Sequence, residues 1–368
     1  MFTTTPERLG SLCSEQIYRY ESDVERDITF KIEDVDSGDL LGVKKFYSTA
    51  TAEINISPIV KQYVLPTTAP YEDGFFTIKR QGYARIGLIE CENGDKSDSQ
   101  TMLLSEDNRG YAIISTIPVE APIENHEGEV ALISAFAPQS RAMSIGESDT
   151  LLFTAPAGSD VRMVVEQYAY EIEDPVAVKS YTMTIEEPGF AAFNVVARPY
   201  MDQLKHILEP QIETLHLRFQ VAQEVSVENE NGTFVTEVVY CDCVTIDYQI
   251  IDQPLDGTRI AWVSHKGTIE HYTFPAIKAR TIDENRVTKM TLCSAFETTR
   301  IREVLAQIVK SPRLWVVTTS IDAPTPEDMM IEGAVTQTYT RAELLSKSLA
   351  STPATSLATM EIEIAYNA

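Results

Sequence analysis

The residues with the clearest metal-ligating chemistry in this chain are Cys241 and Cys243. Positions two apart on a strand face the same side, so a metal held by both thiolates, with His216 or Asp242 as a further ligand, is one interpretation. Structural zinc sites favour a wider cysteine spacing, and no second Cys or His pair lies at a suitable distance. Packing of both thiols in a core is therefore the favoured interpretation.

The sequence also lacks the usual motifs of enzymes with a nucleophilic serine and of nucleotide-binding proteins. Ser148, in Gly-Glu-Ser-Asp, has no second glycine of a nucleophile elbow, and the chain has no glycine-rich phosphate loop. The histidines show no paired metal-binding spacing and are interpreted as surface or packed residues; they are His126, His206, His216, His265 and His271. We predict no enzyme, no catalytic residue, no metal and no cofactor.

Two acidic turns, at 33–39 and 95–98, offer carboxylate oxygens that a calcium ion would accept. Neither follows the calcium-loop pattern, so both are expected to be solvated turns. The Asn231-Gly232-Thr233 triplet matches the glycosylation pattern, but a hairpin turn is the favoured interpretation.

The charge of the chain limits its partners. The 30 basic residues against 55 acidic ones give a net charge of −25, which repels phosphate backbones and anionic bilayers. Sequence-specific nucleic-acid binding is therefore not expected. The acidic surface is interpreted as a solubility device, and the alternative is an acidic lining for a channel through which DNA slides.

The N-terminus lacks the apolar run of a secretory signal, and no window reaches the roughly 18 apolar residues of a membrane-spanning helix. We expect synthesis in a cytosol and no membrane insertion. The five cysteines are odd in number and scattered, which favours reduced thiols over a disulfide framework.

Most of the chain consists of short β-prone runs separated by turn residues, which predicts antiparallel sheets in sandwiches or barrels. The strand-like runs are Gly74 to Lys79, Ala84 to Cys91, Arg162 to Tyr168, Ser180 to Ile185, Leu215 to Glu224 and Phe234 to Tyr240. Asp256 to Pro275 contains two further runs and predicts a hairpin.

Helices are expected to be few. Ser57-Pro58 is a cap and first-turn pair for a short helix towards Val64, and another is expected over 198–208. The best-specified helix follows Thr298 or Thr299 and ends at Ser311-Pro312, with an apolar stripe that belongs to a core. The stripe consists of Ile301, Val304, Leu305, Ile308 and Val309.

An internal duplication is one interpretation of two similar segments in the sequence. Residues 51–56 align with 190–195 and place Asn55 on Asn194, at an offset of 139 (194 − 55). The turn at 92–94 matches 230–232 at an offset of 138 (231 − 93), and a third pair, 128–136 with 257–265, needs a gap. Chance similarity between β-rich segments is the alternative.

Together these patterns predict a mainly β protein with minor α (α+β). It would have two β-sandwich or barrel-like domains and a C-terminal helix-strand segment. The expected boundaries are an N-terminal arm at 1–26, a first β domain at 27–140, a second at 141–285, and a C-terminal α/β segment and tail at 286–368. The terminal stretches Met1 to Tyr20 and Ser346 to Thr359 are interpreted as docking arms or flexible tails.

The order of these elements resembles structural proteins of phages that infect Bacteroidetes bacteria. The resemblance spans about 130–368, through 133–156, 189–196, Tyr240 to Ile250, the Asp256 to Pro275 hairpin and the terminal run Met360 to Ala368. It implies a non-enzymatic virion protein that forms a ring in the tail, baseplate or head-tail connector. Its partners would be copies of itself and neighbouring virion proteins.

The alternative function is a carbohydrate- or receptor-binding β-sandwich module. Such a module needs an exposed cluster of aromatic side chains. The aromatic residues available for it are Tyr168, Tyr170, Trp262, Tyr272 and Trp315.

Overall fold

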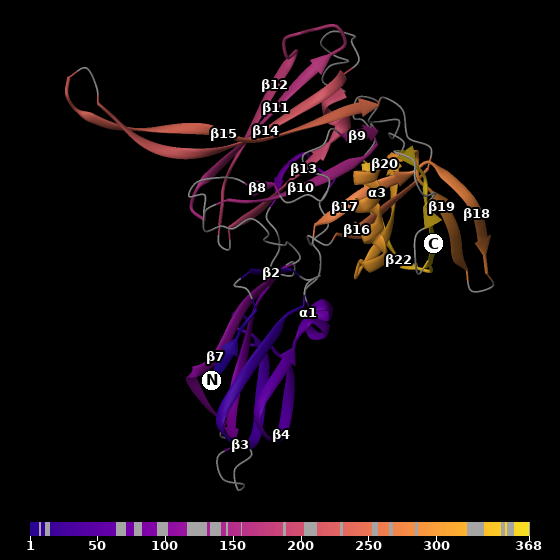
Figure 1. Ribbon diagram of the computed structural model, residues 1–368. Helices are drawn as coiled ribbons and strands as arrows, with labels where there is room; N and C mark the ends of the chain where they lie inside the picture. Colours follow the sequence, from indigo (N-terminus) through magenta and orange to yellow (C-terminus); the bar gives the residue numbers. More distant parts are fainter. Residues whose placement is uncertain are drawn as a thin grey trace, which may run out of the picture. The chain divides into compact units, whose positions relative to one another are not determined.

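The computed structural model (Figure 1) is mainly β with minor α, as predicted. It describes residues 1–6, 9–11, 15–63, 71–76, 83–93, 102–115, 131–132, 141–144, 146–155, 157–186, 189–201, 212–228, 231–251, 257–264, 268–283, 286–321, 335–346, 350–351 and 357–367. The chain divides into two compact units. Unit 1 comprises Met1–Thr67, Ile78–Glu120 and His265–Thr268, and unit 2 comprises Thr68–Thr77, Ala121–Ser264 and Ile269–Ala368.

Unit 1 is built on one sheet with the strand order β1-β3-β6-β7-β2, and β4 pairs with β3 from Ile17 to Glu33. The strands are β1 (Phe2–Thr4), β2 (Leu9–Ser11), β3 (Ile17–Asp34), β4 (Leu40–Asn55), β6 (Tyr83–Asn93) and β7 (Met102–Ser115). Alternating apolar residues of β3 and β4 place aromatic and branched side chains on one face, as period-two patterning requires. That face and helix α1 (Ser57–Tyr63) form the core of the unit.

The first part of unit 2 contains two sheets. One has the order β5-β13-β10-β8 and the other β12-β11-β14-β15-β9. The strands are β5 (Gly74–Phe76), β8 (Ala131–Leu132), β9 (Arg141–Ser144), β10 (Ser148–Thr154), β11 (Asp160–Ala169), β12 (Ala177–Thr184), β13 (Phe190–Val196), β14 (Ile212–Glu228) and β15 (Phe234–Ile251). Side chains from both sheets, including Phe153, Phe193 and Tyr248, share one core.

The same strand pairing recurs in both units. In unit 1, β1 pairs with β3, β3 pairs with β4 and β6, and β6 pairs with β7, which the short parallel strand β2 follows. In unit 2, β8 pairs with β10 and β10 with β13, while β11 pairs with β12 and β14, and β14 pairs with β15, which the short parallel strand β9 follows. The strands β10 and β11 together therefore take the place of β3, and β12 and β13 that of β4. Tyr20 pairs with Phe2 and Ala52, and Phe153 pairs with Leu132 and Ala191.

That register places Ala52 on Ala191, which is the alignment of the sequence comparison. The pairing therefore favours a repeat over a chance match. The third sequence landmark, at 128–136, lies mostly outside the described residues.

The last part of unit 2 is a third, eight-stranded sheet with the order β17-β16-β21-β22-β25-β19-β18, in which β23 also pairs with β25. Its strands are β16 (Thr258–Val263), β17 (Ile269–Phe274), β18 (Ala276–Ile282), β19 (Val287–Cys293), β21 (Leu314–Ile321), β22 (Val335–Leu344), β23 (Ala350–Ser351) and β25 (Met360–Asn367). A two-stranded pair, β20 (Glu297–Thr298) and β24 (Leu357–Ala358), accompanies it. The predicted hairpin at 256–275 is the antiparallel pair β16 and β17.

The capping prediction is confirmed for α3 and wrong for α1. Helix α1 begins at Ser57 itself, and the Ser57 hydroxyl accepts a hydrogen bond from the Gln16 backbone at 2.7 Å, so Ser57 does not cap the helix. Helix α3 (Thr299–Ala306) is capped by the Thr298 hydroxyl, which accepts a hydrogen bond from the Ile301 backbone. It continues as the 3₁₀ turn η2 (Gln307–Lys310) and stops before Ser311-Pro312, as predicted. Val304, Leu305 and Ile308 are buried against the eight-stranded sheet. Of the helix expected at 198–208, residues 197–201 are helical and the others lie outside the described residues.

Two expected boundaries differ from the structure. Residues 1–26 are not a separate arm, because β1 and the start of β3 belong to the first sheet and Tyr18 and Tyr20 are in its core. The boundary expected at 285/286 falls between β18 and β19, which pair with each other. The eight-stranded sheet therefore begins near Thr258, and β5 joins the second unit from within the segment expected to be the first domain.

Candidate functional site

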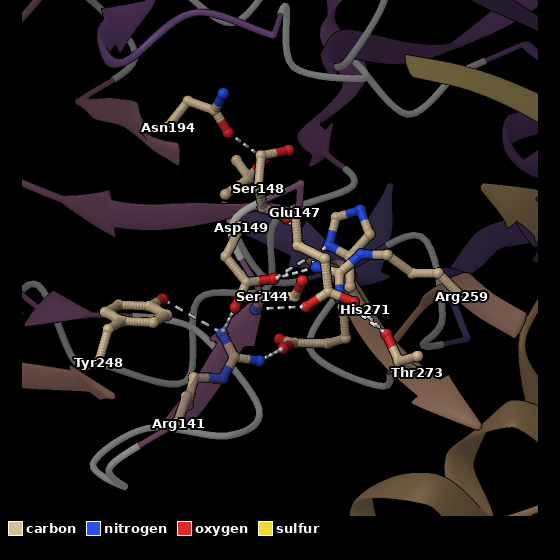
Figure 2. A network of polar contacts seen from close by, with 12 residues as sticks. Arg141, Ser144, Glu147, Ser148, Asp149, Asn194, Tyr248, Arg259, His271 and Thr273 are labelled. Atoms are coloured by element: carbon tan, nitrogen blue, oxygen red, sulfur yellow. Dashed lines mark hydrogen bonds and ion pairs between the residues drawn. The ribbon is translucent and has the colours of Figure 1, made fainter. Parts of the chain in front are cut away.

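The most concentrated set of charged side chains among the described residues is a buried network in unit 2 (Figure 2). It begins at the sharp connection between β9 and β10. There the Glu147 backbone donates to the Ser144 carbonyl, and the Glu147 carboxylate accepts from the Ser144 N–H at 3.0 Å. These two bonds hold the turn so that Glu147, Ser148 and Asp149 all enter the interior.

Arg141 of β9 is the first cation of the network. Its Nη1 lies 2.8 Å from Asp149 Oδ2, and its Nη2 lies 3.2 Å from Glu270 Oε2 on β17. Nη1 also donates to the Tyr248 hydroxyl at 3.4 Å. Burial by itself lowers the pKa of Arg141, but the neighbouring acidic groups, Asp149 foremost, raise that pKa above its usual value. The guanidinium therefore stays charged in the interior.

Arg259 of β16 is the second cation. Its Nη1 lies 3.0 Å from Glu147 Oε1, and its Nη2 lies 3.0 Å from Asp149 Oδ1 and donates to the Ser148 carbonyl at 2.7 Å. The hydroxyl of Thr273 donates to Glu147 and accepts from Arg259. Asp149 thus bridges both arginines, as Figure 2 shows.

His271 of β17 completes the network as a neutral group. Its Nε2 lies 3.0 Å from the Tyr339 hydroxyl on β22, and its Nδ1 lies 3.5 Å from Asp149 Oδ1. Burial, followed by the positive charges of Arg259 and Arg141, lowers the pKa of His271 well below its ordinary value. Burial also raises the pKa of Tyr339 to about 12, so this pair is neutral at pH 7.

Ion pairs of this network connect β9 and β10 with strands β16 and β17 of the eight-stranded sheet. The side chains of Arg141, Asp149 and Glu270 are at most 9% exposed, and each is paired. Breaking a buried ion pair costs about 3–5 kcal/mol because the remaining charge has no partner. The network therefore fixes the eight-stranded sheet to the sheets that contain β9 and β10. Among the described residues, no group of three or more His, Cys, Asp or Glu side chains is placed to hold a metal ion.

Two side chains that the sequence offered for chemistry belong to this network. The Ser148 hydroxyl donates to Gln337 Oε1 at 2.9 Å, so its partner is an amide and not the base that a nucleophilic serine requires. His271 is packed, as expected. By contrast His216, on β14, lies 2.5 Å from Asp247 on the neighbouring β15, away from these residues in the strand register.

The remaining sequence candidates are placed as follows. Cys293 is free and buried, whereas the side chains of Cys13, Cys91, Cys241 and Cys243 lie outside the described part. His126, His206, His265 and the turn at 95–98 lie outside it too. In the turn at 33–39, the Asp34 carboxylate accepts from the Asp36 backbone at 3.1 Å and from the Tyr63 hydroxyl at 2.9 Å. The turn at 231–233 connects β14 to β15.

A second polar cluster holds β5 in unit 2. The Asp73 carboxylate accepts hydrogen bonds from the hydroxyls of Tyr181 and Tyr200 and from the Val196 backbone. Burial raises the pKa of Asp73, although these hydrogen bonds oppose the shift. The Asn194 side chain donates to the Glu72 carbonyl at 3.0 Å. These bonds attach a short segment to a strand that is distant in sequence.

Sequence reasoning missed the network, although a signal was present. Arg259 stands inside the apolar strand Thr258–Val263, and a buried arginine requires a carboxylate partner. The Glu147-Ser148-Asp149 run directly precedes the apolar residues of β10, which are buried. Which carboxylate meets which arginine follows only from the strand pairing.

Comparison with known proteins gives no family. No protein-family model and no curated protein matches the sequence. A solved structure of Escherichia coli alpha-2-macroglobulin activated by porcine elastase shows 8% identity and a TM-score of 0.19, over 98% of this chain and 30% of that one. A tetra-tandem repeat from the extending region of a large adhesion protein shows 9% identity and a TM-score of 0.17, over 92% and 86%. Scores this low support no argument about fold or function.

No helix in the described part of the chain combines the length and the apolar character needed to cross a bilayer.

Proposed function

We propose that this chain is a non-enzymatic structural protein of a bacteriophage virion that associates with copies of itself into a ring. The ring would belong to the tail, the baseplate or the head-tail connector, as the resemblance of the sequence implies. Two properties support the proposal. Buried ion pairs hold the β sheets of unit 2 together, and exposed strand edges and apolar side chains are available for contact with neighbouring copies.

One observation carries the proposal: the hairpin of β14 and β15 extends beyond the sheet to which it belongs (Figure 1). The neighbouring strand β11 pairs with β14 only as far as Val221, so Ala222 to Tyr240 pair only within the hairpin among the described residues. Phe234 is 72% exposed and Val238 is 55% exposed. An isolated two-stranded ribbon is only marginally stable in water, so a partner is expected to cover it.

The carbohydrate- or receptor-binding alternative finds less support. Trp262 is fully buried in the core of the eight-stranded sheet, and the Tyr272 hydroxyl donates to Glu297 at 2.5 Å. Trp315 packs edge-on against Tyr339. Of the aromatic residues considered for such a surface, Tyr170 is the one with a mostly exposed side chain, at 65%. A single tyrosine does not make an aromatic binding platform.

The decisive experiment locates the protein in particles. We expect mass spectrometry of purified virions to find this chain at several copies per particle, and cryo-electron microscopy to trace it in a closed ring. Absence of the chain from purified virions would overturn the proposal. Binding of the purified monomer to specific glycans on an array would favour the alternative.

A further inference from the structure

We infer that the extended hairpin of one copy docks on the edge strand β18 of a second copy by adding strands to its sheet. The inference rests on the proposed self-assembly and names the two surfaces that meet. The hairpin arm comprises residues 222–228 and 231–240, and the acceptor edge is β18.

The hairpin arm has free strand edges and exposed apolar side chains. Beyond Val221 no third strand pairs with β14 in the described part of the chain, and the short parallel strand β9 reaches only Tyr248 to Ile251 of β15. Among the arm side chains that the structure describes, the apolar ones that are more than two-fifths exposed are Phe234, Val235, Val238 and Val239. Unpaired backbone donors and acceptors beside exposed apolar residues are a template for strand addition.

The acceptor edge has matching properties. Among the described strands, β18 is the last of the eight-stranded sheet, and each of its residues from Ala276 to Ile282 is exposed. Ile277 is 46% exposed and Ile282 is 63% exposed. The strand has a bulge at Lys278 in its pairing with β19, after which Ala279 to Ile282 pair regularly. This regular stretch is available for a further strand.

Charge determines which surfaces can meet. The hairpin arm contains glutamates, among them Glu224, Glu228 and Glu237, and no lysine or arginine. Strand β18 contains Lys278 and Arg280 and no acidic residue. Lys278 pairs with Glu361 of the same chain, whereas Arg280 has no ion-pair partner among the described residues.

Two arms would therefore repel each other, as would two β18 edges, while an arm and a β18 edge attract. The contact joins different surfaces of two copies and is heterologous. Such contacts close into a ring when the rotation between copies permits.

The test uses charge reversal in the full chain. We expect Glu237→Lys and Arg280→Glu each to weaken self-association about tenfold or more, measured by sedimentation across concentrations. The double variant restores the opposite charges and is expected to recover association to near the wild-type level. Matched controls are Glu173→Lys, in the turn after β11, and Lys45→Glu, on the edge strand β4; both are exposed, and both should associate like the wild type.

A second variant removes the arm. Ala222 and Tyr240 are cross-strand partners, so residues 223–239 can be replaced by a two-residue Asn-Gly turn without changing the paired part of the sheet. We expect a folded chain with unchanged tryptophan fluorescence and at least about tenfold weaker association.

Two results would overturn the inference: a wild-type chain that stays monomeric at every concentration, or association that neither charge reversal nor arm removal alters. The proposed function would still be judged separately, by whether purified virions contain the chain.

Discussion

At the scale of single residues, Asp149 connects the buried network because its two oxygens meet two different guanidinium groups. Arg259 supplies one of them and also neutralises Glu147. A charge in the interior is stable only while its partner remains, which makes each arginine a sensitive position. Both tryptophans of the chain, Trp262 and Trp315, lie in the eight-stranded sheet and report its unfolding.

We predict that Arg259→Met destabilises unit 2 by about 3–5 kcal/mol, because Glu147 and Asp149 lose a buried partner. Denaturant titration followed by tryptophan fluorescence measures the effect. The matched control is Arg162→Met on β11, whose guanidinium bonds the Ser180 hydroxyl at an exposed position, and it should cost less than about 1 kcal/mol. Equal losses in the two variants would contradict the assignment.

The lowered pKa of His271 predicts that the stability of unit 2 depends on pH. The pKa of His271 is lowered in the folded protein, where Asp149, Arg259, Arg141, Tyr339 and the adjacent Glu270 surround it. The unfolded chain binds a proton as pH falls through about 6.5, and the folded chain does not. Stability is therefore lost below that pH, by up to about 1.4 kcal/mol per pH unit.

The measurement is the free energy of unfolding of unit 2 between pH 7 and pH 5. The His271→Gln variant should have a smaller slope than the wild type over this window, whatever its stability at pH 7. Identical slopes would show that His271 is not the group that titrates.

At the scale of elements, the hydrogen bonds of Asp73 stabilise the position of β5 more than the few backbone hydrogen bonds of this short strand do. The strand has three residues, and its neighbour Asp73 holds the hydroxyls of Tyr181 and Tyr200. We predict that Asp73→Ala costs about 2–4 kcal/mol, because the buried Tyr200 hydroxyl and the partly buried Tyr181 hydroxyl lose their acceptor. Hydrogen exchange should increase in 74–76 and along β13.

The control for this prediction is Asp160→Ala. Asp160 accepts a hydrogen bond from Thr184 at 2.6 Å, but at an exposed position. The Asp160→Ala substitution should leave the rate of hydrogen exchange in β5 nearly unchanged. Loss of protection in both variants would mean that β5 is not held by the Asp73 cluster.

At the scale of the whole molecule, the two units have separate cores. Phe30 belongs to the core of unit 1, whereas Trp262 belongs to that of the eight-stranded sheet. We predict that Phe30→Ala destabilises unit 1 by about 3–5 kcal/mol and leaves the tryptophan-reported transition in place. Calorimetry combined with fluorescence checks this, and a parallel shift of both transitions would contradict independent unfolding.

Assembly belongs to the same scale. A net charge of −25 makes copies repel, so contacts between them need local complementarity. The basic strand β18 and the acidic hairpin arm provide it within an otherwise acidic chain. This contrast of charge is the reason for expecting a head-to-tail contact in place of a symmetric one.

The sequence by itself determined the β class, the end of α3 before Pro312, and the hairpin of β16 and β17. It limited the cap of α3 to Thr298 or Thr299, and the structure shows that Thr298 is the cap. These depend on neighbouring residues, through period-two alternation, capping and turn chemistry. The alignment of Ala52 with Ala191 was also visible in the sequence, and the strand pairing favours its interpretation as a repeat.

Only the tertiary structure decided the domain boundaries, the place of β5, and the partners of Arg141 and Arg259. Each depends on pairing between strands far apart in the chain. Local pattern specifies which face of a strand is apolar but not which strand lies beside it. A carboxylate and a guanidinium more than a hundred residues apart, such as Glu147 and Arg259, become partners only after the sheets pack.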